Sequence, residues 1–232
     1  MTAALCVGLA AFSLFLATIG KSPVEFYGLV YKAGFGTSFS WANTLSRTAP
    51  LLLAALCVAL PARLGLIVIG GEGAIVLGGV AAGAVAMAAP GLPGGVGIAL
   101  MAAAAALIGG AWIGAIGLLR YKRGVNETIA SLLMAYIALA LMNHLVEGPL
   151  RDPASLNKPS TAPLPEGFRI GDLPGLDVHW GLAVGVLGCV IAWALMERTR
   201  WGFAARIIGG NLRAAQVQGL PVGRLLFCWT AL

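Results

Sequence analysis

The chain has 232 residues, of which 59% are hydrophobic and 10% are charged, and its mean hydropathy is +0.90. Soluble domains are about half apolar and about a quarter charged, so this composition excludes an ordinary soluble domain and indicates a membrane protein. A net charge of +6 in a soluble protein would suggest nucleic-acid binding. Here the Lys and Arg residues lie in short segments between apolar runs, so we interpret them as a signal of membrane topology.

Six apolar runs predict membrane-spanning helices, since a span needs about 20 predominantly apolar residues. They cover residues 2–19, 48–62, 64–89, 96–119, 125–146 and 179–196. A further apolar run begins at Leu225 and is too short to cross before the last residue, Leu232, which we interpret as a C-terminal truncation. We therefore expect an all-α polytopic membrane protein, a single transmembrane domain over residues 1–232 with about six full spans and the start of a seventh.

Three segments between the spans have distinct compositions. Residues 20–47 are rich in aromatic residues, Gly and Ser, which predicts an external segment at the membrane surface. Residues 147–178 hold six of the twelve prolines and predict an ordered external loop without a helix. With the amino terminus inside, nine of the fifteen Lys and Arg residues fall in cytoplasmic segments, including residues 197–224. Within that segment we expect one short helix at residues 213–218.

The run at residues 64–89 carries one carboxylate, Glu72, flanked by Gly70, Gly71 and Gly73. If the run is helical throughout, Glu72 lies about 12 Å from its start, well inside a hydrocarbon layer of about 30 Å. An ionised carboxylate at this depth costs about 3 kcal/mol, so it should face other helices or a water-filled cavity. One interpretation is that Glu72 snorkels or satisfies a neighbouring helix; the other, which we favour, is a functional role.

The fifth predicted span carries a polar stripe. At 100° per residue an arc of about 140° holds its polar residues together with one alanine, namely Thr128, Ser131, Ala135, Tyr136 and Asn143. Such a stripe either bonds to neighbouring helices or lines a polar cavity, and the pattern favours neither. Asn126 and Glu127 precede it, and on pattern alone we interpret them as a helix cap and a carboxylate favourable to the helix amino terminus.

The predicted cytoplasmic segment alternates small, aromatic and basic residues. Those of interest are Gly202, Phe203, Arg206, Gly209, Asn211, Ala214, Ala215 and Gly219. A helix between two spans on this face would suit the docking of a soluble partner, or it would lie on anionic lipid. Composition does not separate the two.

The sequence holds no enzymatic pattern. We find no phosphate-binding Gly-Lys-Ser loop, no metal-ligand spacing of His and Glu, and no nucleophile with a plausible base. We therefore expect neither an enzyme nor a metal or cofactor site. Active transport would take its energy from an ion gradient through a group such as Glu72, or from a separate ATPase.

Three motifs resemble one known family. Residues 67–75, IVIGGEGAI, resemble its FNIGxEGQ signature, and residues 124–139, GVNETIASLLMAYIAL, resemble its GVNEVISTLMLNYIAL segment. Residues 199–224 are similar to its cytoplasmic loop, T.WGF.LRAVGxNPxAAxxAGI. The family comprises the permease subunits of ABC importers for branched-chain amino acids, ribose and nucleosides, and these segments resemble its nucleoside and simple-sugar branch.

The resemblance implies a multi-pass permease of the bacterial inner membrane that carries a nucleoside, purine or simple sugar. It implies three partners: a second permease subunit, a cytosolic ATP-binding subunit and an extracytoplasmic substrate-binding protein. It implies that the translocation path is bordered by Gly70, Glu72, Gly73, Asn126, Glu127, Ser131, Tyr136 and Asn143. It also makes the short helix at residues 213–218 a coupling helix, with the eight residues named above for the cytoplasmic segment as ATPase-coupling residues.

Three positions depart from the family pattern. Val68, Ala74 and Ala135 are apolar where the family has polar residues, so we expect a less polar cargo or contacts elsewhere. The alternative function is an ion-coupled secondary transporter that uses Glu72 as a proton carrier. A third class is a structural membrane subunit without a path.

Overall fold

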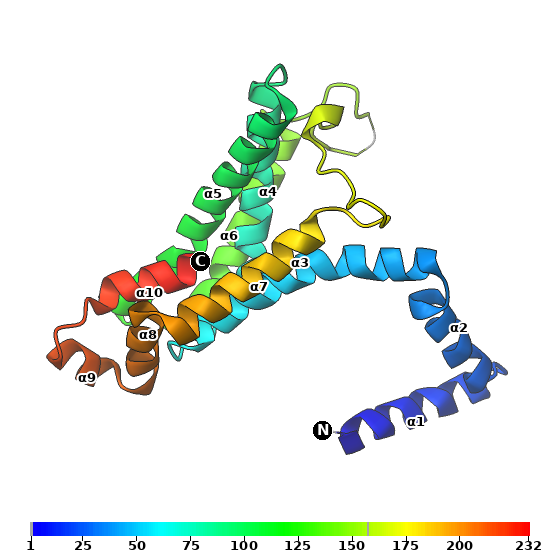
Figure 1. Cartoon of the computed structure of the whole chain (residues 1–232), viewed down its shortest axis with the longest axis horizontal. Helices are drawn as coiled ribbons and strands as arrows, with labels where there is room; N and C mark the ends of the chain where they lie inside the picture. Colours follow the sequence, from blue (N-terminus) through cyan, green and yellow to red (C-terminus); the bar gives the residue numbers. More distant parts are fainter. Residues whose placement is uncertain (1, 157) are drawn as a thin grey trace.

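The computed structural model describes residues 2–156 and 158–232, and the described chain is almost entirely helical (Figure 1). Its helices are α1 (Thr2–Thr18), α2 (Pro23–Phe35), α3 (Ser38–Ala62), α4 (Gly71–Ala88), α5 (Gly94–Arg123), α6 (Glu127–Glu147), the 3-10 helix η1 (Glu166–Phe168), α7 (Gly181–Arg198), α8 (Arg200–Gly210), α9 (Leu212–Val217) and α10 (Val222–Ala231). The described residues form no β-strand, only one isolated bridge between Asp172 and His179. The predicted all-α fold is confirmed.

Five helices, α3 to α7, are long and apolar enough to cross a membrane, and the count rises to six if α1 and α2 form one broken span. These two helices meet at an angle of 117°. The break is local: Gly20 has φ +71° and the Ser22 hydroxyl accepts from the Glu25 N–H, starting a new helix at Pro23. The five predicted spans from residue 48 onward are confirmed as apolar helices of spanning length, the first qualifies only together with α2, and α10 covers the predicted apolar run after Leu225.

Helix α3 begins ten residues before the predicted second span, at Ser38 rather than at residue 48. Thr37 caps it, because its hydroxyl accepts from the Ser40 N–H at 3.0 Å. Most of the segment at residues 20–47, predicted as an interfacial connection, is therefore helical, as α2 and the first turns of α3. The aromatic composition of this segment predicted a location at the membrane surface but did not predict its helical conformation. Its external location stays a prediction.

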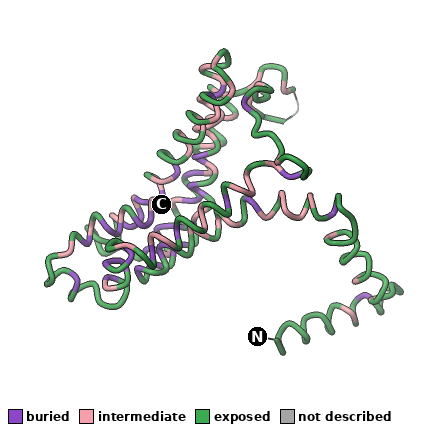
Figure 2. Tube along the Cα trace, in the orientation of Figure 1, coloured by how far each residue is buried: buried purple, intermediate pink, exposed green. Residues whose placement is uncertain are grey.

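The spans form two groups that diverge from a common base (Figure 1). Helices α4, α5 and α6 pack together in one group, and α3 packs on α7 in the other. Helix α10 lies antiparallel to α5 at the base, where glycines of α5 allow close contact: a Cβ at Gly114 would lie 2.9 Å from the Phe227 ring. Buried residues gather at this base, whereas α1 is exposed along nearly its whole length (Figure 2). The core therefore sits where α3, α5, α8 and α10 meet.

The proline-rich connection between α6 and α7 contains no α-helix among its described residues, only η1. It is nevertheless ordered, because Phe168 is 4% exposed and its ring lies against Gly97 at the start of α5. The prediction of an ordered, non-helical loop is confirmed for the described residues; Asn157 lies outside them. Its external location stays a prediction.

Candidate functional site

The predicted third span does not begin as a helix. Helix α3 ends at Ala62, Gly65 adopts φ +75°, and the Leu66 N–H closes the turn by donating to the Pro61 carbonyl at 3.1 Å. Residues 66–69 are then non-helical, and α4 starts only at Gly71. The prediction of a helix from residue 64 is wrong, because the left-handed Gly65 ends the preceding turn and the next residues bond to another helix instead.

Residues 66–69 are hydrogen-bonded to the start of α6. The Thr128 hydroxyl donates to the Ile67 carbonyl at 2.9 Å, and the Ile69 N–H donates to the Ser131 Oγ at 3.2 Å. Ser131 is fully buried and donates in turn to the Thr128 carbonyl at 2.9 Å. Val68 lies between these bonds and is 2% exposed, in the core. An apolar residue at position 68 thus has a packing reason in this chain.

Two glycines let α4 lie directly on α6. A Cβ at Gly70 would overlap the Ser131 carbonyl oxygen, and a Cβ at Gly73 would lie 2.9 Å from the Cα of Ala135. Ala135 is 8% exposed at this contact, so a longer polar side chain would not fit there without moving the helices apart. Gly70 and Gly73 therefore act through backbone packing, and the apolar Ala135 belongs to the same contact.

Glu72 lies in the first turn of α4, halfway along the group formed by α4, α5 and α6. Its neighbour Gly73 meets Ala135, eight residues after the first residue of α6, or about 12 Å along that helix. The start of α4 therefore lies partway along this helix group, and the depth of Glu72 in a membrane stays a prediction. A helix that starts at this depth directs its free N–H groups and its positive dipole end into the bundle.

The Glu72 side chain lies on the face of α4 that its neighbours leave open. Gly73 faces α6, while Ala74 faces Gly109 of α5. Gly79 and Gly83 share the Glu72 face by helical spacing, and a Cβ at either glycine would find no atom within 4 Å. Glu72 is exposed, and within residues 2–156 and 158–232 no hydrogen bond or ion pair engages its carboxylate. Its charge is therefore not satisfied by a neighbouring helix of the described chain.

The predicted polar stripe divides into two parts. Thr128, Ser131 and Ala135 pack against residues 67–73, as the interpretation of bonding between helices requires. Tyr136 is 70% exposed and Asn143 is also exposed, on another side of α6. An arc of about 140° is wide enough to include both sides, which is why the pattern alone grouped them. The structure does not bring Tyr136 or Asn143 to the bonded segment.

Asn126 and Glu127 take the capping roles that the pattern alone favoured. The Asn126 Oδ1 accepts from the N–H groups of Thr128 at 2.9 Å and Ile129 at 3.2 Å. Glu127 is 8% exposed, and its Oε2 lies 3.4 Å from the Arg120 Nη1. A carboxylate in the first turn of α6 is also favoured by the helix dipole. These two residues lie at the base of α6, below the level of Glu72.

Replacing Ser131 by Ala is expected to lower the melting temperature of the detergent-solubilised protein by roughly 2–4 °C, because the Ile69 N–H loses its partner at a cost of about 1 kcal/mol. The matched control is Thr48→Ala, since the Thr48 hydroxyl bonds only to the Thr44 carbonyl of its own helix. Thermal unfolding of the two variants checks this. Equal melting temperatures for both would contradict a structural role for the bond to Ile69.

The segment after α7 packs onto the base through glycines. Gly202 lies against the Met196 carbonyl at the end of α7, and Gly209 lies against the Arg63 carbonyl at the end of α3. Helix α9 matches the predicted short helix within one residue at each end. The Asn211 side chain caps it by accepting from the N–H groups of Arg213 and Ala214, both at 3.0 Å. Helix α8 is thus fixed to both helices of the group formed by α3 and α7.

The remaining predicted coupling residues divide by exposure. Ala215 is fully buried, whereas Ala214 is exposed and Phe203 is 61% exposed. Gly219 has φ +75° and ends the turn after α9, a conformation that side chains rarely adopt. The Phe203 side chain is thus an apolar surface that the described chain leaves uncovered.

One carboxylate that the sequence did not single out joins three elements at the base. The Glu197 Oε2 lies 2.6 Å from the Arg206 Nη1 of α8, and its Oε1 lies 4.0 Å from the Arg63 Nη2 after α3. These groups are partly exposed, so each pair contributes less than about 1 kcal/mol and mainly orients α8. The available signal was a lone acidic residue in an otherwise basic segment.

Comparison with known proteins gives a consistent family. The family model described as "Branched-chain amino acid transport system / permease component" matches residues 40–232. The chain is 35% identical over 229 residues to a glucose ABC transporter permease protein of Haloferax volcanii, with 94% of this chain and 59% of the relative covered. It is 31% identical over 229 residues to a guanosine ABC transporter permease protein of Bacillus subtilis, with 94% and 63% covered.

A nucleoside ABC transporter permease protein of Lactococcus lactis is 24% identical over 226 residues, with 92% of this chain and 61% of the relative covered. The chain thus spans about three fifths of the length of the curated relatives it matches. No solved structure matches it. Its apolar helices and these matches fit a multi-pass inner-membrane protein. The chain belongs to the family of permease components of branched-chain amino acid transport systems.

Proposed function

We propose that the chain forms the translocation path of an ABC importer for a small polyhydroxylated solute, a simple sugar or a nucleoside. The observation that carries this is the start of α4 halfway along its helix group, which leaves an unengaged carboxylate on an open face. A broken helix with a polar end at mid-depth is typical of solute sites in transporters. We propose that Glu72 borders the path directly, while Gly70 and Gly73 hold the start of α4 against α6.

The proposed solute class follows from chemistry shared by the relatives' named cargoes. Glucose and guanosine both carry a sugar ring with several hydroxyl groups. An ionised carboxylate accepts two or more such O–H groups, and these charge-assisted bonds are stronger than neutral ones. Glu72 supplies this acceptor, and the free N–H groups at the start of α4 supply donors.

A short route connects the cytoplasmic segment to Glu72, and it supports a coupling role for α8 and α9. Gly209 of α8 lies against Arg63, and a Cβ at Gly65 would lie 3.5 Å from the Gly209 carbonyl oxygen. From Gly65 the non-helical residues 66–69 lead directly to Gly70 and Glu72. We propose that a cytosolic ATP-binding subunit docks on α8 and α9 and shifts this route, so that access to the path alternates. A second permease subunit and an extracytoplasmic substrate-binding protein complete the proposed complex.

Uptake assays test this function against its alternative. Labelled glucose and guanosine are supplied to cells that contain the permease with or without its ATP-binding subunit. Uptake of one of them should require that subunit and should persist when a protonophore collapses the proton gradient. Uptake that continues without any ATPase and stops with the gradient would support proton coupling through Glu72 instead.

The Asn211→Ala variant is expected to weaken co-purification of the ATP-binding subunit about fivefold, since loss of a helix cap costs about 1 kcal/mol and α9 has only six residues. The control is Ser22→Ala, which removes the side-chain cap of α2 far from this segment. Pull-down through a tag on the permease measures the retained subunit. Equal retention by both variants would contradict docking on α9.

A further inference from the structure

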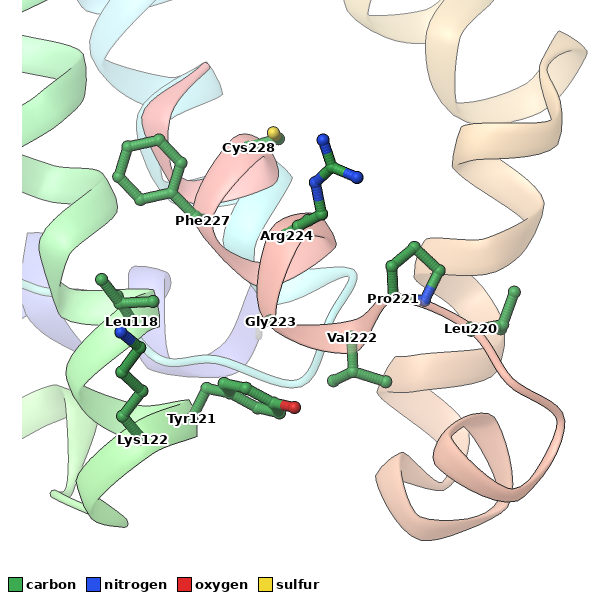
Figure 3. Close-up of a pocket in the computed structure, with 10 residues that line it drawn as sticks. All are labelled: Leu118, Tyr121, Lys122, Leu220, Pro221, Val222, Gly223, Arg224, Phe227 and Cys228. Carbon is green, nitrogen blue, oxygen red and sulfur yellow. The ribbon is translucent and has the colours of Figure 1, made fainter.

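A cavity of about 600 Å³ lies between the end of α5 and the start of α10 (Figure 3). Its walls are largely apolar, with Leu118 from α5 and Val222 and Phe227 from α10. The volume is within the range of small-molecule sites, about 300–1,000 Å³. The cavity therefore offers space for an apolar chain at the base of the bundle, away from Glu72.

Two cations border this apolar space. Figure 3 shows the Lys122 side chain running back along α5 toward Leu118, while the Arg224 guanidinium points along α10 toward Cys228. Both charged groups thus lie beside the apolar lining instead of extending past the helix ends. Both residues are exposed at the rim of the cavity, where their charges can attract an anionic partner.

The described chain does not supply that partner. No carboxylate of residues 2–156 and 158–232 lies within 4.0 Å of Lys122 or Arg224. The neighbouring Arg120, in contrast, is paired with Glu127 at 3.4 Å. Lys122 and Arg224 therefore have no acidic partner among the described residues.

The floor of the cavity depends on a specific backbone contact. A Cβ at Gly223 would lie 2.6 Å from the Tyr121 ring, so only glycine lets this ring lie flat against the start of α10. The Tyr121 ring lies at the edge of the cavity, below the start of α10 (Figure 3). Tyrosine, lysine and arginine at the ends of spans are typical of the level of lipid headgroups.

We propose that this cavity binds one anionic phospholipid, with an acyl chain along Leu118 and Phe227 and its acidic headgroup at the rim that carries Lys122 and Arg224. Basic pockets between spans bind acidic headgroups by this chemistry. The proposal is independent of the transported solute, because the cavity lies on the other side of α5 from the α4 contact.

Alkylation of Cys228, an exposed thiol that lines the cavity, reports its occupancy. The full-length permease is purified in detergent, titrated with dioleoyl phosphatidylglycerol or dioleoyl phosphatidylcholine, and treated with N-ethylmaleimide before peptide mass spectrometry. Phosphatidylglycerol should slow the alkylation of Cys228, and phosphatidylcholine should not. Equal protection by both lipids, equal protection by inorganic phosphate, or a Cys228 that is unreactive without lipid would overturn the proposal.

Charge variants test the two cations. The Lys122→Gln/Arg224→Gln protein should need about 30-fold more phosphatidylglycerol for half-protection, since each cation near an anionic lipid contributes about 1 kcal/mol. Lys122→Arg/Arg224→Lys should restore the wild-type midpoint, which separates lost charge from misfolding. Arg151→Gln/Lys158→Gln, which removes two cations from the proline-rich loop, is the matched control and should leave the midpoint unchanged. An unchanged midpoint in the first variant would overturn the proposal.

Discussion

Replacing Glu72 by Gln is expected to reduce solute uptake by about tenfold or more while the amount of protein in the membrane stays unchanged. The size of the side chain is kept, but charge-assisted bonds to solute hydroxyls, each contributing about 1.5–3 kcal/mol, become neutral ones. Stability should not change, because no group of the described chain bonds to the Glu72 carboxylate. Initial uptake rates and immunoblots of membranes measure the two quantities.

The matched control for this variant is Glu166→Gln, which removes a carboxylate in η1, next to the start of α5 and at the opposite end of α4 from Glu72. It should take up solute at the wild-type rate. Uptake by the Glu72→Gln protein at that same rate would reduce Glu72 to a structural residue, even if ATP-dependent import by the complex is established independently.

Replacing Gly70 by Ala is expected to destabilise the protein by more than about 3 kcal/mol, the upper end of ordinary overpacking costs. The added methyl group would overlap the Ser131 carbonyl oxygen, and both partners of this contact are backbone, so neither can move aside by changing a rotamer. Thermal unfolding in detergent should show a strong loss of melting temperature or no folded protein.

The control for the Gly70 contact is Gly79→Ala, because a Cβ at Gly79 would meet no atom within 4 Å. Alanine has the higher helix propensity, so this variant should melt at the wild-type temperature or slightly above it. If both variants melt alike, α4 does not pack on α6 as described.

The existence of the spans was predictable from apolar runs, but their boundaries were not. Residues 66–69 are apolar and are compatible with a helix, so only the glycines that flank them, Gly65 and Gly70, are a local sign of the break before α4. What decides their conformation is a contact 62 residues away, between Ile69 and Ser131. Such long-range bonds override helix propensity and are invisible to a local pattern.

The candidate site was predictable in part for the same reason. Glu72 and its glycines stood out because a charge in an apolar run needs an explanation, and the structure gives the glycines their contacts. Tyr136 was grouped with Ser131 only because one helix carries both. The apolar residues Val68 and Ala135, which suggested a changed cargo, are explained by burial in this chain. The solute preference therefore does not follow from those two positions.

Water access to the open face of α4 is the most direct test of the proposed path. A cysteine at position 79, two helical turns beyond Glu72 on that face, is compared with a cysteine at position 107 of α5. The native residue there, Leu107, is 71% exposed. Gly79→Cys and Leu107→Cys are placed in a chain whose four native cysteines are replaced by Ser, and both are treated with a membrane-impermeant thiol reagent in the assembled complex. The proposal predicts that Gly79→Cys reacts, that transported solute slows this reaction, and that Leu107→Cys stays unlabelled in lipid. A Gly79→Cys thiol as unreactive as that of Leu107→Cys would show that this face meets lipid or protein, and would contradict the path.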